Sequence, residues 1–162
     1  MVDRRRRDQF AEILRHFAAG LLTNVEYEKR VDDIFEGMSR KQLKDLALSA
    51  VWENVWFLYD DMSTHRLRDS HALPPEAKTE IARWIMFLYT DEEYQWPNVS
   101  FISLSSCLLS IVTLGLWDLI FRPYRERKFA RHGNRDVWPF LTTQEFEESR
   151  RKPHLLHRAA SS

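Results

Sequence analysis

Apolar residues recur every three or four positions along most of this chain, a pattern typical of amphipathic α-helices. The first such segment covers residues 3–19, and Gly20 after it is a natural stop for a helix. Thr23 followed by Glu26 is a capping box, in which each side chain bonds the other residue's backbone N–H at a helix start. The helix that it opens ends near Gly37, so the start of the chain predicts two helices joined by a short turn.

A second capping box at residues 39–42 predicts a long helix that continues to about Tyr59. Its apolar stripe is too wide for a helix with one exposed face, so we expect it to lie centrally. Residues 60–73 are predicted to form an ordered but irregular connection to the next helix. Pro75 then favours the first turn of a further helix, which continues to Tyr89.

The segment 99–121 is the longest apolar stretch and contains a single charge, Asp118. As a helix it would measure roughly 34 Å, at about 1.5 Å per residue, which is enough for a bilayer core of about 30 Å. Trp96 and Trp117 are spaced as two aromatic anchors at opposite membrane interfaces would be. The basic residues that follow, and that would contact lipid headgroups, are Arg122, Arg125, Arg127, Lys128 and Arg131.

Two features of the same segment favour a protein environment instead. Six Ser and Thr residues lie within it and weaken insertion into lipid. Its basic flank would also place residues 1–98, with 14 basic and 18 acidic side chains, outside the cytoplasm. The sequence therefore leaves three surroundings open for this helix: a buried core, a single span of a membrane, or the interface of a membrane.

Beyond the apolar segment, residues 122–152 predict a basic helix, an extended segment at 137–140 and a short C-terminal helix capped by Thr142. Residues 153–162 are expected to be a frayed tail. The fold class predicted for the whole chain is all-α: a single-domain bundle of about five to seven helices with one long apolar helix. We expect its core to include Phe10, Phe17, Phe35, Leu46, Trp52, Trp56, Trp84 and Phe87.

Charge and composition narrow the classes of function. The 24 basic and 24 acidic residues cancel, which disfavours nucleic acid as a partner. The basic run Arg4–Arg7 is interpreted as a solvated helix start. The single cysteine, Cys107, excludes a disulfide within one chain and favours a cytoplasmic protein, with association to the cytoplasmic membrane left open.

One group of side chains consists of residue types that bind metal ions. Asp60, Asp61, His65 and His71 lie in a single connection, and two carboxylates with two imidazoles are able to ligate a divalent ion. Their spacing matches no specific metal motif, so salt bridges and loop capping are the favoured roles. The chain also lacks a P-loop, a nucleophile elbow, a dinucleotide fingerprint and a zinc-protease helix, and no cofactor is expected.

Four short segments, the residues 56–61, 81–91, 94–97 and 137–140, resemble small bacterial proteins of unknown function, over roughly residues 8–150. This resemblance implies an α-helical fold and a bacterial origin, and it implies no activity, cofactor or partner. The leading hypothesis is a non-catalytic helical factor, an adaptor or an immunity-type protein, that binds a protein partner. The alternatives are a membrane-associated protein anchored by residues 99–121 and a metal-dependent enzyme that uses the loop of Asp60 and His65.

Overall fold

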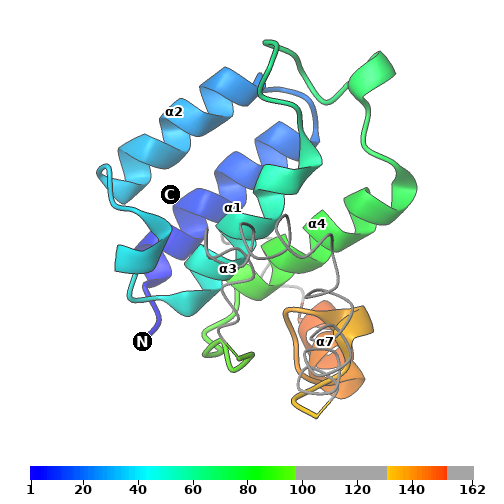
Figure 1. Cartoon of the computed structure of the whole chain (residues 1–162). Helices are drawn as coiled ribbons and strands as arrows, with labels where there is room; N and C mark the ends of the chain where they lie inside the picture. Colours follow the sequence, from blue (N-terminus) through cyan, green and yellow to red (C-terminus); the bar gives the residue numbers. More distant parts are fainter. Residues whose placement is uncertain (98–130, 153–162) are drawn as a thin grey trace, which may run out of the picture.

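The computed structural model describes residues 1–97 and 131–152, and these residues form an all-α fold (Figure 1). Within these two ranges there is no strand, only an isolated antiparallel bridge between Thr23 and Arg66. The α-helices are α1 (Arg4–Ala18), α2 (Asn24–Phe35), α3 (Leu46–Val55), α4 (Pro75–Leu88) and α7 (Thr143–Arg150). The short 3-10 turns are η1 (Arg40–Gln42), η2 (Trp56–Leu58), η3 (Asp69–His71) and η4 (Arg135–Val137).

Several helix starts follow the predicted capping chemistry. At α2, the Thr23 hydroxyl accepts a hydrogen bond from the Glu26 N–H at 3.1 Å, and the Glu26 carboxylate accepts from the Thr23 N–H at 2.8 Å. Thr142 caps α7 by accepting from the Glu145 N–H at 3.2 Å. Pro75 occupies the first turn of α4, where its missing N–H removes no helical hydrogen bond. The capping predictions at these three starts are confirmed.

The predicted continuous helix from residue 39 to Tyr59 is wrong. The capping box of Ser39 and Gln42 is present, but it opens only the turn η1, because Leu43 is extended with ψ 122°. A new helix then starts at Asp45, whose carboxylate accepts from the Ala47 N–H at 3.0 Å. The sequence pattern missed this break because apolar periodicity continues across it.

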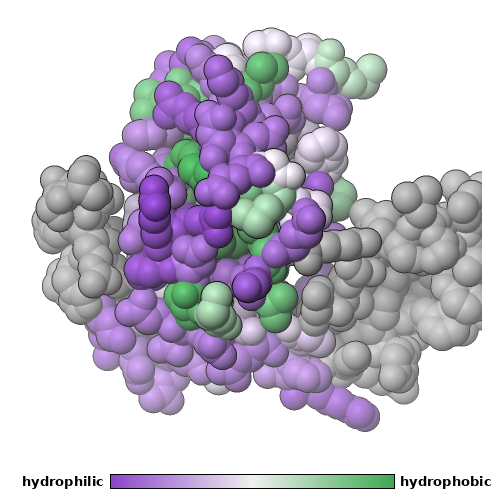
Figure 2. Space-filling view, turned by 90° about the vertical axis from the view of Figure 1, so that its left-hand side faces the viewer, coloured by the Kyte–Doolittle hydropathy of each residue, from purple (hydrophilic) through white to green (hydrophobic). Residues whose placement is uncertain are grey.

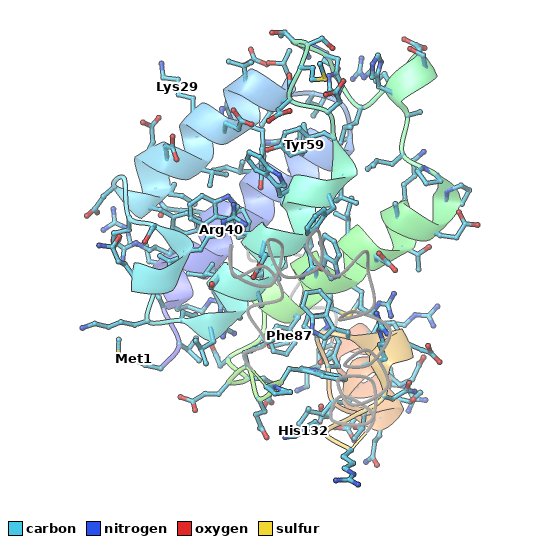
Figure 3. The ribbon with its side chains drawn as sticks, in the orientation of Figure 1. Met1, Lys29, Arg40, Tyr59, Phe87 and His132 are labelled. Carbon is cyan, nitrogen blue, oxygen red and sulfur yellow. The ribbon has the colours of Figure 1, made fainter. Side chains whose placement is uncertain are left out.

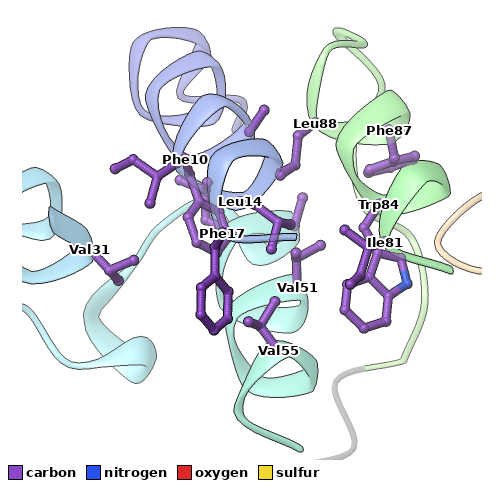
Figure 4. Close-up of a cluster of buried hydrophobic side chains, with 14 of the residues drawn as sticks. Phe10, Leu14, Phe17, Val31, Val51, Val55, Ile81, Trp84, Phe87 and Leu88 are labelled. Atoms are coloured by element: carbon purple, nitrogen blue, oxygen red, sulfur yellow. The ribbon is translucent and has the colours of Figure 1, made fainter. Parts of the chain in front are cut away.

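Helix α1 is the centre of the bundle and contacts α2, α3 and α4 (Figure 1). Its apolar face packs into one cluster of side chains from all four helices (Figure 4). Members of this cluster include Phe10, Leu14, Phe17, Val31, Val51, Val55, Ile81, Trp84, Phe87 and Leu88. Of the predicted core residues, Phe10, Phe17, Phe35, Trp84 and Phe87 are buried, and Trp52 is partly buried against them. The prediction for Leu46 is wrong, since this residue faces outward in the first turn of α3.

A charged pair lies inside this apolar core. Arg7 is fully buried, and its Nε and Nη2 donate to the two carboxylate oxygens of Asp45 at 2.7 Å and 2.9 Å. Its Nη1 donates to the carbonyls of Thr90 and Glu92, at 3.0 Å and 2.9 Å. One guanidinium therefore connects the start of α1, the start of α3 and the segment that follows α4.

The interpretation of Arg4–Arg7 as a solvated helix start is wrong for three of the four arginines. Arg4 donates to the carbonyls of Leu88 and Thr90 at the end of α4, where a helix leaves its last carbonyls without partners. Arg6 donates to the Ile34 carbonyl near the end of α2 at 3.2 Å. Only Arg5 is exposed, so the basic run mainly fastens α1 to its neighbours.

Residues 131–152 pack against the end of α4 (Figure 1). The Phe140 ring meets the Phe87 ring edge to face, with centroids 5.1 Å apart. The predicted extended segment at 137–140 is correct only in part: Val137 belongs to the turn η4, whereas Trp138 before its proline has ψ 136°. The Trp138–Pro139 peptide bond is cis.

Candidate protein-interaction surface

Three large apolar side chains are exposed within one short stretch of the chain that begins directly after α3. Trp56 is 44% exposed, Phe57 66% and Met62 90%. We call these three residues the apolar edge. Trp56 was expected in the core, and that expectation is wrong. Burying an aromatic or methionine side chain gains roughly 1.5–3 kcal/mol of hydrophobic free energy. The isolated chain does not gain this free energy in full, because the three side chains stay exposed.

The backbone explains why Trp56 and Phe57 both face outward. Helix α3 ends at Val55, which is fully buried, and the tighter turn η2 follows directly. Tyr59 then turns extended, with φ −143° and ψ 158°, and returns its ring to the core beside Phe17. Trp56 and Phe57 are left on the outside of the turn, whereas Leu58 and Tyr59 pack in part against the core.

Asn24, buried at the start of α2, fixes the loop that carries Met62. Its side-chain N–H donates to the Asp60 carbonyl at 3.0 Å and to the Ser63 carbonyl at 2.9 Å, and its side-chain oxygen accepts from the His65 N–H at 3.1 Å. The backbone N–H of Met62 donates to the Asp60 carboxylate at 2.8 Å. Met62 is therefore exposed on a loop with a defined conformation.

The guanidinium of Arg40 lies over two indole rings, one of which is the ring of Trp56 in the apolar edge. The carbon at the centre of its guanidinium is 5.4 Å from the Trp52 ring centroid and 5.7 Å from that of Trp56. Trp52 in turn packs on Phe35 in the core, at 4.8 Å between centroids. These cation–π contacts link Arg40 and the exposed Trp56 to the buried aromatic cluster.

Two tyrosines complete the aromatic cluster between α2 and α3, where Figure 3 shows Tyr59 and Arg40. The Tyr59 hydroxyl donates to the Glu28 carboxylate at 3.0 Å, and burial, with the charge of Glu28, raises the pKa of Tyr59 well above its usual value. Burial likewise raises the pKa of Tyr27, whose hydroxyl has no hydrogen-bond partner among the described residues. Both phenols are therefore neutral at ordinary pH, so the formal charges beside these rings include the Arg40 cation and the Glu28 carboxylate.

The neighbouring face of the molecule has a different character. Figure 2 views the side on which α2 lies, and this face is largely hydrophilic with small hydrophobic areas. Exposed charged residues of α2, among them Glu26, Lys29, Arg30, Asp32 and Asp33, account for that character. The apolar edge is thus bordered by a polar surface, as is common for interaction sites on soluble domains.

The structure places the predicted metal-binding residues without forming a metal centre from them. The rings of His65 and His71 stack, with centroids 4.3 Å apart, while the Asp60 carboxylate accepts from the Met62 N–H. Asp61 is exposed on the loop. Within the described residues, no group of three or more His, Cys, Asp or Glu side chains is arranged to hold a metal ion.

Only two of the predicted membrane-contact residues, Trp96 and Arg131, lie in the part of the chain that the structure describes. Trp96 is 2% exposed, and its indole N–H donates to the carbonyls of Pro139 and Phe140, so its side chain lies inside the fold. Arg131 is exposed. The apolar segment 99–121 lies outside the described residues, as do the candidates Trp117, Arg122, Arg125, Arg127 and Lys128. In residues 1–97 and 131–152, no helix is long and apolar enough to cross a lipid bilayer.

Comparison of the chain with known protein families, with curated proteins and with solved structures finds no match in any of the three. The predicted resemblance to small bacterial proteins therefore gains no support from these comparisons. What the chain does has to be argued from its own surface chemistry.

Proposed function

We propose that this protein is a non-catalytic helical interaction factor that binds a partner protein through the apolar edge of Trp56, Phe57 and Met62. The observation that carries the proposal is the exposure of these three side chains, two of them in the turn η2 and one in the loop that Asn24 holds. Trp is among the residues that contribute most to binding energy at protein interfaces, and Met adapts its shape to different partners.

Order in the unbound chain supports the same proposal. Binding through side chains that are already held in place loses less conformational entropy than binding through a flexible segment. Trp56 contacts the guanidinium of Arg40, and the loop of Met62 is held by hydrogen bonds from the Asn24 side chain. The edge is thus pre-organised for a partner whose apolar side chains cover it.

The experiment uses a photo-cross-linking residue, p-benzoylphenylalanine, in place of Phe57 in the full chain, in cells that make the protein. We expect one discrete cross-linked adduct. Because Trp56 is proposed as a main contact, Trp56→Ser is expected to lower the adduct yield at least about tenfold, the effect of a loss of about 1.4 kcal/mol.

The matched control is Leu46→Ser, at the other end of α3. Leu46 is 43% exposed, nearly the same as Trp56, but lies outside the apolar edge. We expect Leu46→Ser to leave the adduct yield unchanged. If no adduct forms at position 57, or if both serine variants lower the yield equally, the proposal is wrong.

A further inference from the structure

We propose that Arg40 is a carboxylate receptor, and that the partner presents an Asp or Glu side chain beside the apolar residue that covers Trp56. This inference rests on the proposed function and names the chemistry of its partner. It starts from the two indole rings that hold the guanidinium of Arg40 and from the absence of any carboxylate bound to it in residues 1–97 and 131–152.

The two faces and the edge of a guanidinium make different kinds of contact. Aromatic rings contact its faces, whereas its five N–H donors point outward in the plane and match the two oxygens of a carboxylate. At Arg40, Trp52 and Trp56 contact the guanidinium, and the side chain is only half-buried. The guanidinium is therefore held against two rings, while no ion pair within the described residues uses its donors.

Arg7 shows the contrasting case within the same chain. Its guanidinium is fully buried, with both oxygens of Asp45 and two backbone carbonyls as acceptors. An arginine that serves stability alone is satisfied in this way inside the fold. Arg40 is anchored on rings at the surface beside an exposed tryptophan, and Arg and Trp are the residue types enriched where interfaces are strongest.

The charges around the site favour a carboxylate over a phosphate group. The pKa of Tyr59 is raised in part by the nearby charges of Glu28 and Asp61, so negative charge is already close to the aromatic cluster. A phosphate group carries a charge near −2 at neutral pH and is typically bound by a cluster of arginines, whereas Arg40 is the cation that acts on Tyr59 at this site. The single positive charge of Arg40 neutralises one carboxylate, which matches an Asp or Glu of the partner.

A small probe tests this chemistry without the partner. N-acetylphenylalanine combines a carboxylate with an aromatic ring, and N-acetylphenylalanine amide is the same molecule without the charge. In two-dimensional NMR of the full chain, we expect the carboxylate to shift the Arg40 Nε–H and the indole N–H signals of Trp52 and Trp56. The expected Kd is about 1–10 mM for a probe of this size, and at least about tenfold weaker for the amide.

Variants of Arg40 separate charge from geometry. Arg40→Gln is expected to remove the preference for the carboxylate over the amide. Arg40→Lys keeps the charge but loses the planar fork of donors, so only part of the preference is expected to remain. Arg5→Gln, a change at an exposed arginine of α1, is expected to have no effect. Equal binding of the two probes, or no shift of the Arg40 signal, overturns the inference.

The partner captured by cross-linking at position 57 distinguishes the two proposals. If Trp56→Ser and Arg40→Gln each weaken its binding at least tenfold, both proposals stand. If Trp56→Ser weakens it and Arg40→Gln does not, the carboxylate receptor is wrong and the apolar edge remains. If neither variant weakens it, both are wrong.

Discussion

The carboxylate of Asp45 accepts two hydrogen bonds from the buried guanidinium of Arg7, at 2.7 Å and 2.9 Å, although the two residues lie 38 positions apart. The same carboxylate accepts from the backbone N–H groups of Asp3 and Ala47, at 2.9 Å and 3.0 Å. It therefore caps α3, anchors the start of α1 and neutralises Arg7 at once. Since each of its oxygens has two donors, the pair is well compensated despite its burial.

We expect Arg7→Met to lower the free energy of unfolding by about 3–5 kcal/mol. Methionine replaces the volume of the side chain but leaves the Asp45 carboxylate buried without its cation, and removing one partner of a buried pair has an effect of this size. The carbonyls of Thr90 and Glu92 also lose their donor. Urea unfolding followed by circular dichroism measures the change.

Arg5→Met is the matched control for that measurement, because Arg5 lies on the same helix but is exposed. Its effect is expected to stay within about 0.5 kcal/mol, as for most surface substitutions. An Arg7→Met variant as stable as the Arg5→Met variant would contradict the central role of the Arg7–Asp45 pair.

We expect the removal of two tyrosine hydroxyls in the aromatic cluster to change the free energy of unfolding in opposite directions. Tyr27→Phe is expected to raise the free energy of unfolding by about 1 kcal/mol, because the Tyr27 hydroxyl is buried without a partner among the described residues. Tyr59→Phe is expected to lower it by about 1 kcal/mol, because the hydrogen bond to Glu28 is lost. Thermal and urea unfolding of both variants check the signs, and a loss of stability in Tyr27→Phe would show that its hydroxyl has an acceptor.

Stability is expected to fall in alkaline solution, from about pH 10 upward. Burial raises the pKa of Tyr94 from 10.0 to about 12 in the folded chain. Below pH 10 this phenol is protonated in both states, so its contribution is fully present there. Above pH 10 the unfolded state loses the proton first and is favoured, and the contribution disappears as the pH passes the folded pKa of about 12. For Tyr94 alone, the loss between these values is about 2 kcal/mol.

Tyr94→Phe isolates this effect in unfolding measurements at pH 7 and pH 11.5. The variant loses the hydrogen bond that the Trp138 indole donates to the Tyr94 hydroxyl, which lowers stability at both pH values alike. Its decrease in stability between the two pH values is expected to be smaller than that of the parent chain. An equal decrease in both proteins would show that Tyr94 ionises as readily folded as unfolded.

Local sequence signals predicted where the helices start more reliably than they predicted which residues of different helices meet. Thr23, Pro75 and Thr142 marked helix starts correctly, since a cap depends on residues only a few positions away. The break before α3 was missed because it depends on Asp45 meeting Arg7 from a distant part of the chain. A signal for Arg7 was present, however: it lies three residues before Phe10 and seven before Leu14, on the buried face of α1.

The candidate site was harder to predict than the fold. Periodicity assigned Trp56 to the core, because a helix continuing from Val55 would have kept its apolar stripe inward. The change to a 3-10 turn at this point alters the direction of the following side chains, and composition carries no signal for it. The contacts of Arg40 with Trp52 and Trp56 likewise depend on how η1 packs on α3. Only the three-dimensional structure shows this packing.

The final prediction connects the order of the Met62 loop with binding. Asn24→Ala removes three side-chain hydrogen bonds that fix this loop, to the backbone of Asp60, Ser63 and His65. We expect faster amide hydrogen exchange at His65, whose N–H loses its acceptor, whereas amides in the middle of α1 exchange only through global unfolding. Because Asn24 is buried and does not belong to the apolar edge, any weaker partner binding would come from the loop's lost order. Thr23→Ala, which removes the neighbouring cap and costs about 1 kcal/mol, controls for general destabilisation. Partner binding equally weak in both variants would show that stability, rather than the ordered loop, determines affinity.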